Sequence, residues 1–171
     1  MISKRFFATI SIGFCLCLTA CAVPVKQPPE ASSSPLARNV ILFIGDGMGV
    51  STTTAIRILD GQRKGMAGEE NVLPFERFPH VALSKTYEVN QQVGESAGTA
   101  TAMMSGRKTN AGFIGVDMYA NRGDCASSRQ HHLASILELS ELAGKSTGIV
   151  STTRLTHATP AAAYAHVPER D

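Results

Sequence analysis

The sequence has no tryptophan, and aromatic residues make up only 6% of its 171 residues. Proteins that hold single-stranded nucleic acid by stacking need aromatic side chains, so that function is not expected. The chain also has little excess of charge of either sign, because it contains 16 Lys and Arg and 14 Asp and Glu. Loss of Lys4 and Arg5 with an N-terminal signal would leave 14 of each. A neutral mature chain argues against electrostatically driven binding to nucleic acid.

Cysteine is scarce in the globular part of the chain. Three of the four cysteines, at positions 15, 17 and 21, lie in or at the edge of an N-terminal apolar run, and only Cys125 follows it. The sequence therefore predicts no disulfide framework. A single cysteine in an oxidising compartment is either free or paired with something outside this chain.

The N-terminal segment has the features of an export signal. Lys4 and Arg5 precede the run FFATISIGFCLCLTA, which at 15 residues is shorter than the roughly 20 that span a bilayer as a helix. The run ends in Leu-Thr-Ala-Cys, which resembles the lipobox of bacterial lipoproteins, with Cys21 as the lipidated residue. The alternative is an ordinary cleaved signal in which Cys21 is incidental.

These observations predict a signal peptide at 1–20 and a tether at 21–38, because the latter contains four prolines and three consecutive serines. They also predict an exported protein on the periplasmic side of the cell envelope, anchored to the membrane by lipid. The catalytic unit is expected to begin at residue 39.

Strand and helix signals alternate from residue 39 onwards. The run VILFIG after Asn39 is typical of a buried strand, and 80–89 and 145–153 are expected as further strands. Helices are expected at 51–62, stopped by Gly61, at 96–106, at 131–144 and from Pro160. This order predicts a layered α/β domain with a mostly parallel sheet and a ligand site at the carboxyl ends of its strands.

Two residues, one at a strand end and one at an expected helix start, stand in positions suited to chemistry. Asp46 stands between glycines, where an unpaired carboxylate is costly and a divalent cation is its natural partner, although an Asp in a tight turn explains it too. Ser96 precedes a run of small residues that is expected to be helical. It is either an N-cap or a nucleophile that the helix N-terminus stabilises.

A second polar segment crosses from a strand end into a helix start. His157 and Thr159, two residues apart, project the same way from extended backbone and could both face a metal or its waters. A helix cap explains Thr159 but leaves His157 unexplained. The sequence position of Arg170 indicates a surface arginine, unless the chain turns back towards the carboxyl edge of the sheet.

Three long motifs closely resemble those of alkaline phosphatases, in the same order. They are NVILFIGDGMGVS at 39–51, KTYEVNQQVGESAGTATAMMSG at 85–106 and GKSTGIVSTTRLTHATPAAAYAHVPER at 144–170. The resemblance covers 39–171 and implies a layered α/β/α sandwich with a mostly parallel central sheet. It also implies that these residues are an incomplete N-terminal portion of that domain.

The resemblance implies an enzyme that hydrolyses phosphate monoesters through a phosphoserine intermediate and uses two Zn²⁺ and one Mg²⁺. Asp46 would bridge a zinc and the magnesium, Ser96 would be the nucleophile resting on that zinc, and Thr159 would bind magnesium. His157 would act at the third metal site, directly or through water. Arg170 is the last implied catalytic residue, and its guanidinium would bind two phosphate oxygens in a bidentate manner.

Two features of this chain depart from the family pattern. Most relatives have Asp before the nucleophile, where this chain has the longer Glu95. The remaining metal ligands of the family lie C-terminal to the matched motifs, so we expect the 171 residues alone to be inactive and poorly folded, and the full-length enzyme to be a homodimer.

Two other functions are compatible with parts of the sequence. Residues 94–98 satisfy the GxSxG pattern of serine acyl hydrolases, although the preceding residues 90–94 are poor strand formers. A noncatalytic lipoprotein that binds phosphate ligands is the other alternative. The retained Ser96 and Arg170 argue against it.

Overall fold

A computed structural model describes residues 37–171 of the chain. The predicted signal peptide, Cys21 and the tether up to residue 36 lie outside the described residues. The chain divides into two compact units between Leu42 and Phe43, and the second, Phe43–Asp171, contains every predicted site residue except Cys21.

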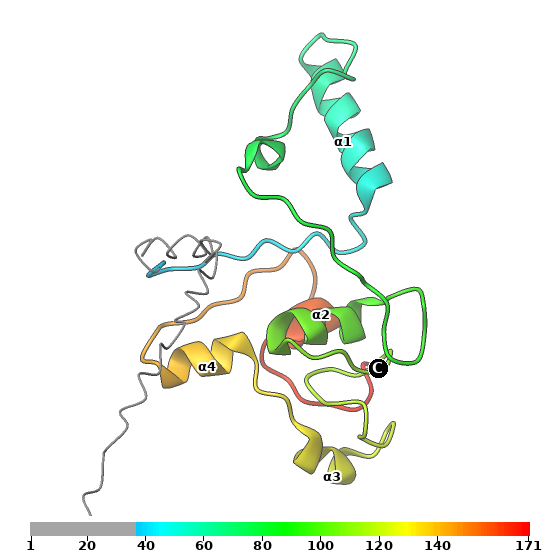
Figure 1. Ribbon diagram of the computed structural model, residues 1–171, viewed down its shortest axis with the longest axis vertical. Helices are drawn as coiled ribbons and strands as arrows, with labels where there is room; N and C mark the ends of the chain where they lie inside the picture. The colour runs from blue at the N-terminus through cyan, green and yellow to red at the C-terminus, as the bar shows by residue number, and fades with distance from the viewer. Residues whose placement is uncertain (1–36) are drawn as a thin grey trace, which may run out of the picture. The chain divides into compact units, whose positions relative to one another are not determined.

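The described residues form short helices joined by long irregular segments (Figure 1). The α-helices are α1 (Val50–Arg63), α2 (Ser96–Ser105), α3 (Cys125–Ser128), α4 (Ile136–Leu142) and α5 (Ala158–Ala161). Two 3₁₀ turns cover Pro74–Arg77 and Arg129–His131. In this part of the chain, no helix is both long enough and apolar enough to cross a bilayer.

Helix α1 confirms the predicted helix but not its predicted stop. The helix continues past Gly61 to Arg63, and Gly61 is buried within it. A Cβ at Gly61 would lie 2.7 Å from the Cα of Gly68. Glycine is therefore required here because the following loop packs directly against the helix, not because the helix ends.

Helix α4 is shorter than the predicted helix over 131–144. Ser135 caps it by accepting a hydrogen bond from the N–H of Glu138, while the Glu138 carboxylate accepts one from the N–H of Ser135. This capping box places the start at Ile136 and leaves 131–135 outside the helix. The predicted stop is confirmed, since Gly144 has a φ of +75° just beyond the C-cap.

Helix α5 begins before Pro160, not at it. Its N-cap is His157 and its first residue is Ala158, so Pro160 is the third helical residue. Proline is tolerated there because the N–H groups of a first turn have no acceptor within the helix.

The segments expected as strands form no ladder within residues 37–171. Only two isolated antiparallel bridges are present there, Ile114 with Val167 and Val116 with His132. The apolar side chains of the expected strands are correspondingly exposed, with Leu83 at 97% and Val150 at 100%. A parallel strand is stable only between neighbours that pair with it, and the described residues supply none for these segments.

The main core lies between α2 and α5, which pass close to each other in Figure 1. The sequence predicts that the small residues of α2 pack against a sheet, whereas in the described residues they pack against α5. The buried members of this cluster are Ala97, Ala100, Met104, Ile114, Ala158, Ala161, Ala162 and Ala163. Alanine on both helices lets the two backbones approach closely, so the ends of α2 and α5 are held together.

Thr101 ties α2 to the segment that follows it. Its fully buried hydroxyl donates to the carbonyl of Phe113 at 3.1 Å and accepts from the N–H of Gly115 at 3.0 Å. Replacing Thr101 by valine leaves both backbone groups unpaired, so we expect the free energy of unfolding to fall by about 1–3 kcal/mol. Urea denaturation of the full-length protein measures this change.

Thr54→Val is the matched control, because the Thr54 hydroxyl only bonds the Val50 carbonyl within α1. We expect its urea midpoint to stay close to that of the unsubstituted protein. Equal midpoints for Thr101→Val and Thr54→Val would contradict the role given to Thr101.

Candidate active site

The N-terminus of α2 carries Ser96 as its first helical residue, and the preceding Glu95 is the N-cap. The Glu95 carboxylate accepts hydrogen bonds from the N–H groups of Ala97 and Gly98, both at 2.8 Å. The cap that the sequence could assign to Ser96 is therefore made by Glu95. This leaves the Ser96 hydroxyl available for another partner.

That partner is Arg170. Its Nη1 donates to Ser96 Oγ at 2.8 Å and also to Glu95 Oε2. The chain does turn back after α5, where Val167 pairs with Ile114, and the Arg170 side chain is only 25% exposed. Arg170 is thus not the surface arginine that its sequence position alone suggests.

Glu95 is held in its ionised form. Burial alone would raise its pKa, but the N–H groups of Ala97, Gly112 and Gly98, together with Arg170, lower the pKa of Glu95 to about 2. Its contribution to stability is therefore present above the usual glutamate pKa and is lost only as the pH falls towards 2.

A second carboxyl, Glu88, lies behind the same turn. It is 3% exposed, and its Oε1 accepts the N–H of Glu95 at 3.1 Å. Burial raises the pKa of Glu88, and the negative charge of Glu95 raises it further against that hydrogen bond. A Cβ on Gly98 would lie 2.5 Å from Glu88 Oε1, so glycine in the first turn of α2 makes room for this carboxyl.

Asp46, His157 and Thr159 form a second polar group. Thr159 Oγ1 donates to Asp46 Oδ2 at 2.8 Å, and His157 Nδ1 lies 3.8 Å from the same oxygen. His157 Nδ1 is buried and has no hydrogen-bond partner. A buried, unpartnered ring nitrogen near a carboxylate that also binds a hydroxyl is the kind of donor set that a divalent cation satisfies.

One packed core supports both groups. Ala97 follows Ser96 and Ala158 lies between His157 and Thr159, and both alanines are buried in the cluster between α2 and α5. The structure thus pairs Ser96 with Arg170 and brings Asp46, His157 and Thr159 together. The chemical roles of these five residues stay predictions.

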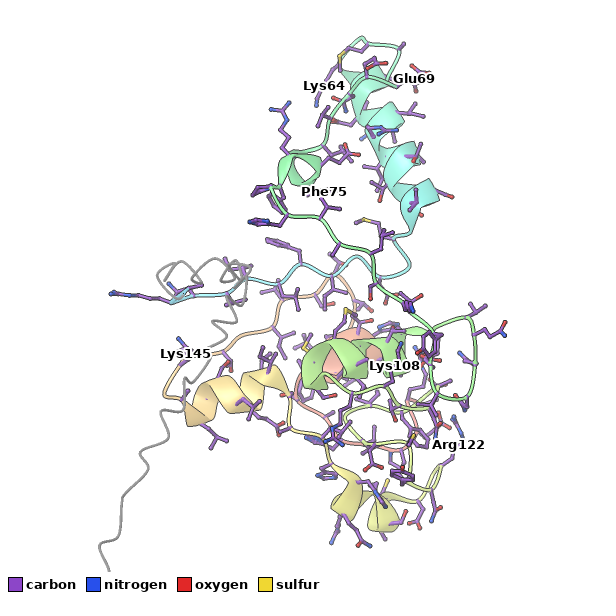
Figure 2. The ribbon with its side chains drawn as sticks, viewed as in Figure 1. Lys64, Glu69, Phe75, Lys108, Arg122 and Lys145 are labelled. Atoms are coloured by element: carbon purple, nitrogen blue, oxygen red, sulfur yellow. The ribbon has the colours of Figure 1, made fainter. Side chains whose placement is uncertain are left out.

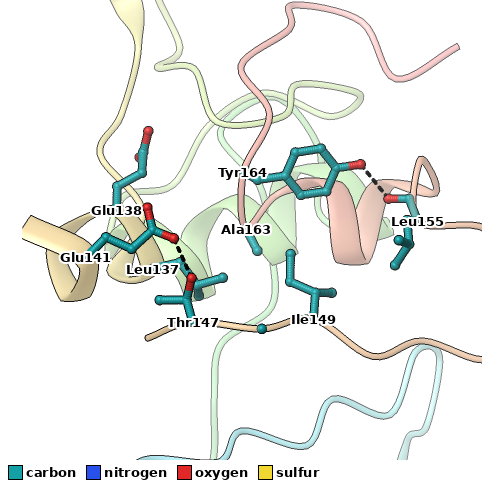
Figure 3. Close-up of a pocket in the computed structure, with 9 residues that line it drawn as sticks. Leu137, Glu138, Glu141, Thr147, Ile149, Leu155, Ala163 and Tyr164 are labelled. Carbon is teal, nitrogen blue, oxygen red and sulfur yellow. Dashed lines mark hydrogen bonds between the residues drawn. The ribbon is translucent and has the colours of Figure 1, made fainter. Parts of the chain in front are cut away.

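A pocket of about 520 Å³ lies elsewhere, between α4 and the residues that flank α5 (Figure 3). Glu141 accepts a hydrogen bond from Thr147 at its edge, and Tyr164 donates to the carbonyl of Leu155 at 2.8 Å. None of the predicted site residues lines this pocket. The candidate site is therefore defined by its side-chain contacts and not by this cavity.

Glu88, Gly112 and Glu169 also contact the site, although the sequence alone does not single them out. Gly112 donates its N–H to Glu95 Oε1 at 2.8 Å, and Glu169 Oε1 accepts the N–H of Arg170 at 3.0 Å. Glu88 and Glu169 lie within the matched motifs, but nothing in their spacing assigned them a role, and Gly112 lies outside the motifs.

Comparison with known proteins identifies what the chain resembles. The family described as alkaline phosphatase matches residues 37–171. The human tissue-nonspecific isozyme of alkaline phosphatase is 46% identical over 183 residues, an alignment that covers 96% of this chain and 34% of the human protein. The chain thus spans about a third of the length of that relative.

Solved structures agree with the sequence matches. Alkaline phosphatase from a cold-adapted Shewanella species superposes with a TM-score of 0.61 and 32% identity, over 75% of this chain and 29% of that one. A mutant alkaline phosphatase from the Antarctic bacterium TAB5, solved with magnesium bound, superposes with a TM-score of 0.51 and 32% identity. That alignment covers 64% of this chain and 29% of the mutant enzyme. These likenesses confirm the predicted fold class, with the chain as an incomplete portion of it.

The relatives also correct one prediction. The sequence predicts a periplasmic protein with a lipid anchor, but the curated relatives come from vertebrates and an insect. The predicted bacterial location is therefore wrong. The N-terminal features that suggested it lie outside the described residues.

Proposed function

The chain belongs to the alkaline phosphatase family, and on that premise we propose that it contributes the nucleophile and the phosphate-binding arginine for hydrolysis of phosphate monoesters. The observation that carries the proposal is the contact of Arg170 Nη1 with both Ser96 Oγ and Glu95. A charged donor placed on a serine hydroxyl at a helix N-terminus suits the binding of an anion beside that hydroxyl.

Ser96 acts as the nucleophile. Its Oγ attacks phosphorus, the bond from phosphorus to the ester oxygen breaks, and the alcohol leaves with a proton; water then cleaves the phosphoserine and releases inorganic phosphate. Glu95 is a poor base for the Ser96 proton because its pKa is about 2. Arg170 cannot accept it either, since a guanidinium stays protonated. The protein's contribution is therefore positioning and charge neutralisation.

Arg170 orients the phosphoryl group. Both of its contacts at the site use Nη1, and a guanidinium has five N–H donors in a rigid fork, so donors remain for two phosphate oxygens. The Glu95 carboxylate holds the guanidinium through the same Nη1. Because the Glu95 carboxylate already caps the N-terminus of α2, the positive charge beside the Ser96 hydroxyl is that of Arg170.

Asp46, His157 and Thr159 fit a divalent cation, because the His157 nitrogen is buried without a partner beside a carboxylate and a hydroxyl oxygen. Bound there, Zn²⁺ or Mg²⁺ would supply a Lewis acid that lowers the pKa of a nearby hydroxyl or water. We propose the family complement of two Zn²⁺ and one Mg²⁺. Within residues 37–171, no three His, Cys, Asp or Glu side chains are grouped to hold a metal, so these residues provide only part of the ligand set.

Chelation distinguishes this function from serine acyl transfer. We expect the full-length enzyme to release phosphate from an aryl phosphate, to lose that activity on exhaustive dialysis against a chelator, and to regain it with Zn²⁺ and Mg²⁺. The 171-residue chain assayed alone should stay at background, because it holds only part of the ligand set. Activity that survives metal removal and is abolished by an acylating serine reagent would instead support the GxSxG alternative.

The remaining proposals concern partners. The substrate class is phosphate monoesters, and no nucleic acid is proposed as a specific partner. We further propose a homodimer for the full-length enzyme, which light scattering would measure directly.

A further inference from the structure

We propose that Arg122 is a positioning residue, one that sets the phosphate-binding geometry of Arg170 by clamping the two segments that carry the contact between Glu95 and Arg170. This inference rests on the proposed function. Arg122 lies on the loop between α2 and α3, where Figure 2 labels it. It comes from neither of the segments that bear the predicted site residues.

The guanidinium of Arg122 joins two separate pieces of chain. Its Nη1 pairs with Glu169 Oε2 at 2.5 Å, and its Nη2 donates to the carbonyl of Ala111. Glu169 immediately precedes Arg170, and its other oxygen, Oε1, accepts the Arg170 N–H at 3.0 Å. One arm of the clamp therefore fixes the backbone from which Arg170 extends.

The other arm reaches Glu95. The Ala111 carbonyl belongs to the peptide unit whose nitrogen is that of Gly112, and the Gly112 N–H donates to Glu95 Oε1 at 2.8 Å. Glu95 Oε2 in turn accepts from Arg170. The contacts thus close into a ring that runs from Arg122 through both segments to the pair formed by Glu95 and Arg170.

Two further observations show that this arrangement is built into the fold. The Arg122 guanidinium carbon lies 5.3 Å from the ring centroid of Phe113, which is only 2% exposed. A Cβ on Gly112 would lie 2.7 Å from Arg122 Nη1 and 3.1 Å from Glu169 Oε1. Gly112 has a φ of +81°, which favours glycine, and a side chain there would displace the two groups that form the clamp.

Binding of inorganic phosphate to the metal-loaded, full-length enzyme tests the clamp, measured by titration calorimetry and by competitive inhibition of turnover. Arg122→Met keeps the aliphatic bulk but removes both polar contacts, and we expect phosphate affinity to fall roughly tenfold, as for coupled residues of one network. KM should rise in proportion while kcat changes little. Arg122→Lys should recover part of the affinity, because an ammonium keeps the pairing with Glu169 but not the fork.

A double substitution separates positioning from general destabilisation. If Arg122 acts through Arg170, then Arg122→Met should cause no further loss of phosphate affinity in an Arg170→Ala background. Lys64→Met is the matched control: Lys64 is similarly exposed, forms a 2.5 Å pair with Asp60, and touches neither segment, so its phosphate affinity should be unchanged.

Three outcomes separate the alternatives. An unchanged phosphate affinity in Arg122→Met would overturn the clamp, and so would an equal loss in both backgrounds. Failure of the unsubstituted enzyme to turn over monoesters would refute the proposed function instead. Calorimetry would then still report whether Arg122 and Arg170 are coupled in binding phosphate.

Discussion

Replacing Ser96 by alanine should lower monoester turnover of the full-length enzyme by several orders of magnitude and abolish the phosphoserine intermediate. The alanine removes the attacking oxygen and the acceptor of the Arg170 contact, while Glu95 continues to cap α2. The helix and the metal content should therefore be largely preserved. Phosphate release measures the loss, and circular dichroism together with metal analysis shows that the fold and the metals persist.

Ser105→Ala is the matched control for this substitution. Ser105 ends the same helix, and its hydroxyl donates to the carbonyl of Thr101 and accepts the N–H of Arg107, so it contacts no predicted site residue. Turnover should stay close to that of the unsubstituted enzyme. Turnover by Ser96→Ala equal to that of Ser105→Ala would show that Ser96 is not the nucleophile.

Replacing Asp46 by alanine should be the most severe change on the metal side of the site. It removes the oxygen to which Thr159 donates at 2.8 Å and which faces the unpartnered His157 nitrogen. A cation shared by these groups would lose its only anionic ligand among them, so both bound metal and activity should fall far more than in Arg170→Ala. Elemental analysis after gel filtration measures the metal independently of activity.

Asp117→Asn provides the comparison for Asp46→Ala. Asp117 also pairs with a histidine, His131, at 3.0 Å, and that pair includes none of the predicted site residues. If this change left the metal content intact while Asp46→Ala lost it, the carboxylate at 46 would be specifically required. Full metal content in Asp46→Ala would contradict the assignment.

Local signals in the sequence predict the helices better than their ends. Ser51 and the small residues after Ser96 indicate α1 and α2 correctly, because helix periodicity and composition are local properties. The stop at Gly61 is wrong because a tertiary contact with Gly68 explains that glycine. The early start of the helix predicted at 131 is wrong because Ser135 and Glu138 form the cap.

The site shows the same division between local and long-range information. Resemblance to family motifs identifies all five candidate site residues, because each lies within one of the three matched motifs. They are Asp46, Ser96, His157, Thr159 and Arg170. The contacts among them join residues far apart in the chain, 74 residues from Ser96 to Arg170 and 113 from Asp46 to Thr159, and no pattern along the chain reports such contacts. The exposed strand segments are the converse case: their apolar runs are clear in the sequence, but pairing depends on neighbours that residues 37–171 do not supply.

As the nucleophile, Ser96 should carry the phosphoryl group during turnover. The most direct measurement is an acid quench of the full-length enzyme during turnover of a phosphate monoester, followed by proteolysis and mass spectrometry of the peptide that contains Ser96. The account predicts a single phosphate on Ser96 that disappears when substrate is exhausted. Steady turnover with no phosphate on Ser96, or with phosphate on another residue, would contradict it.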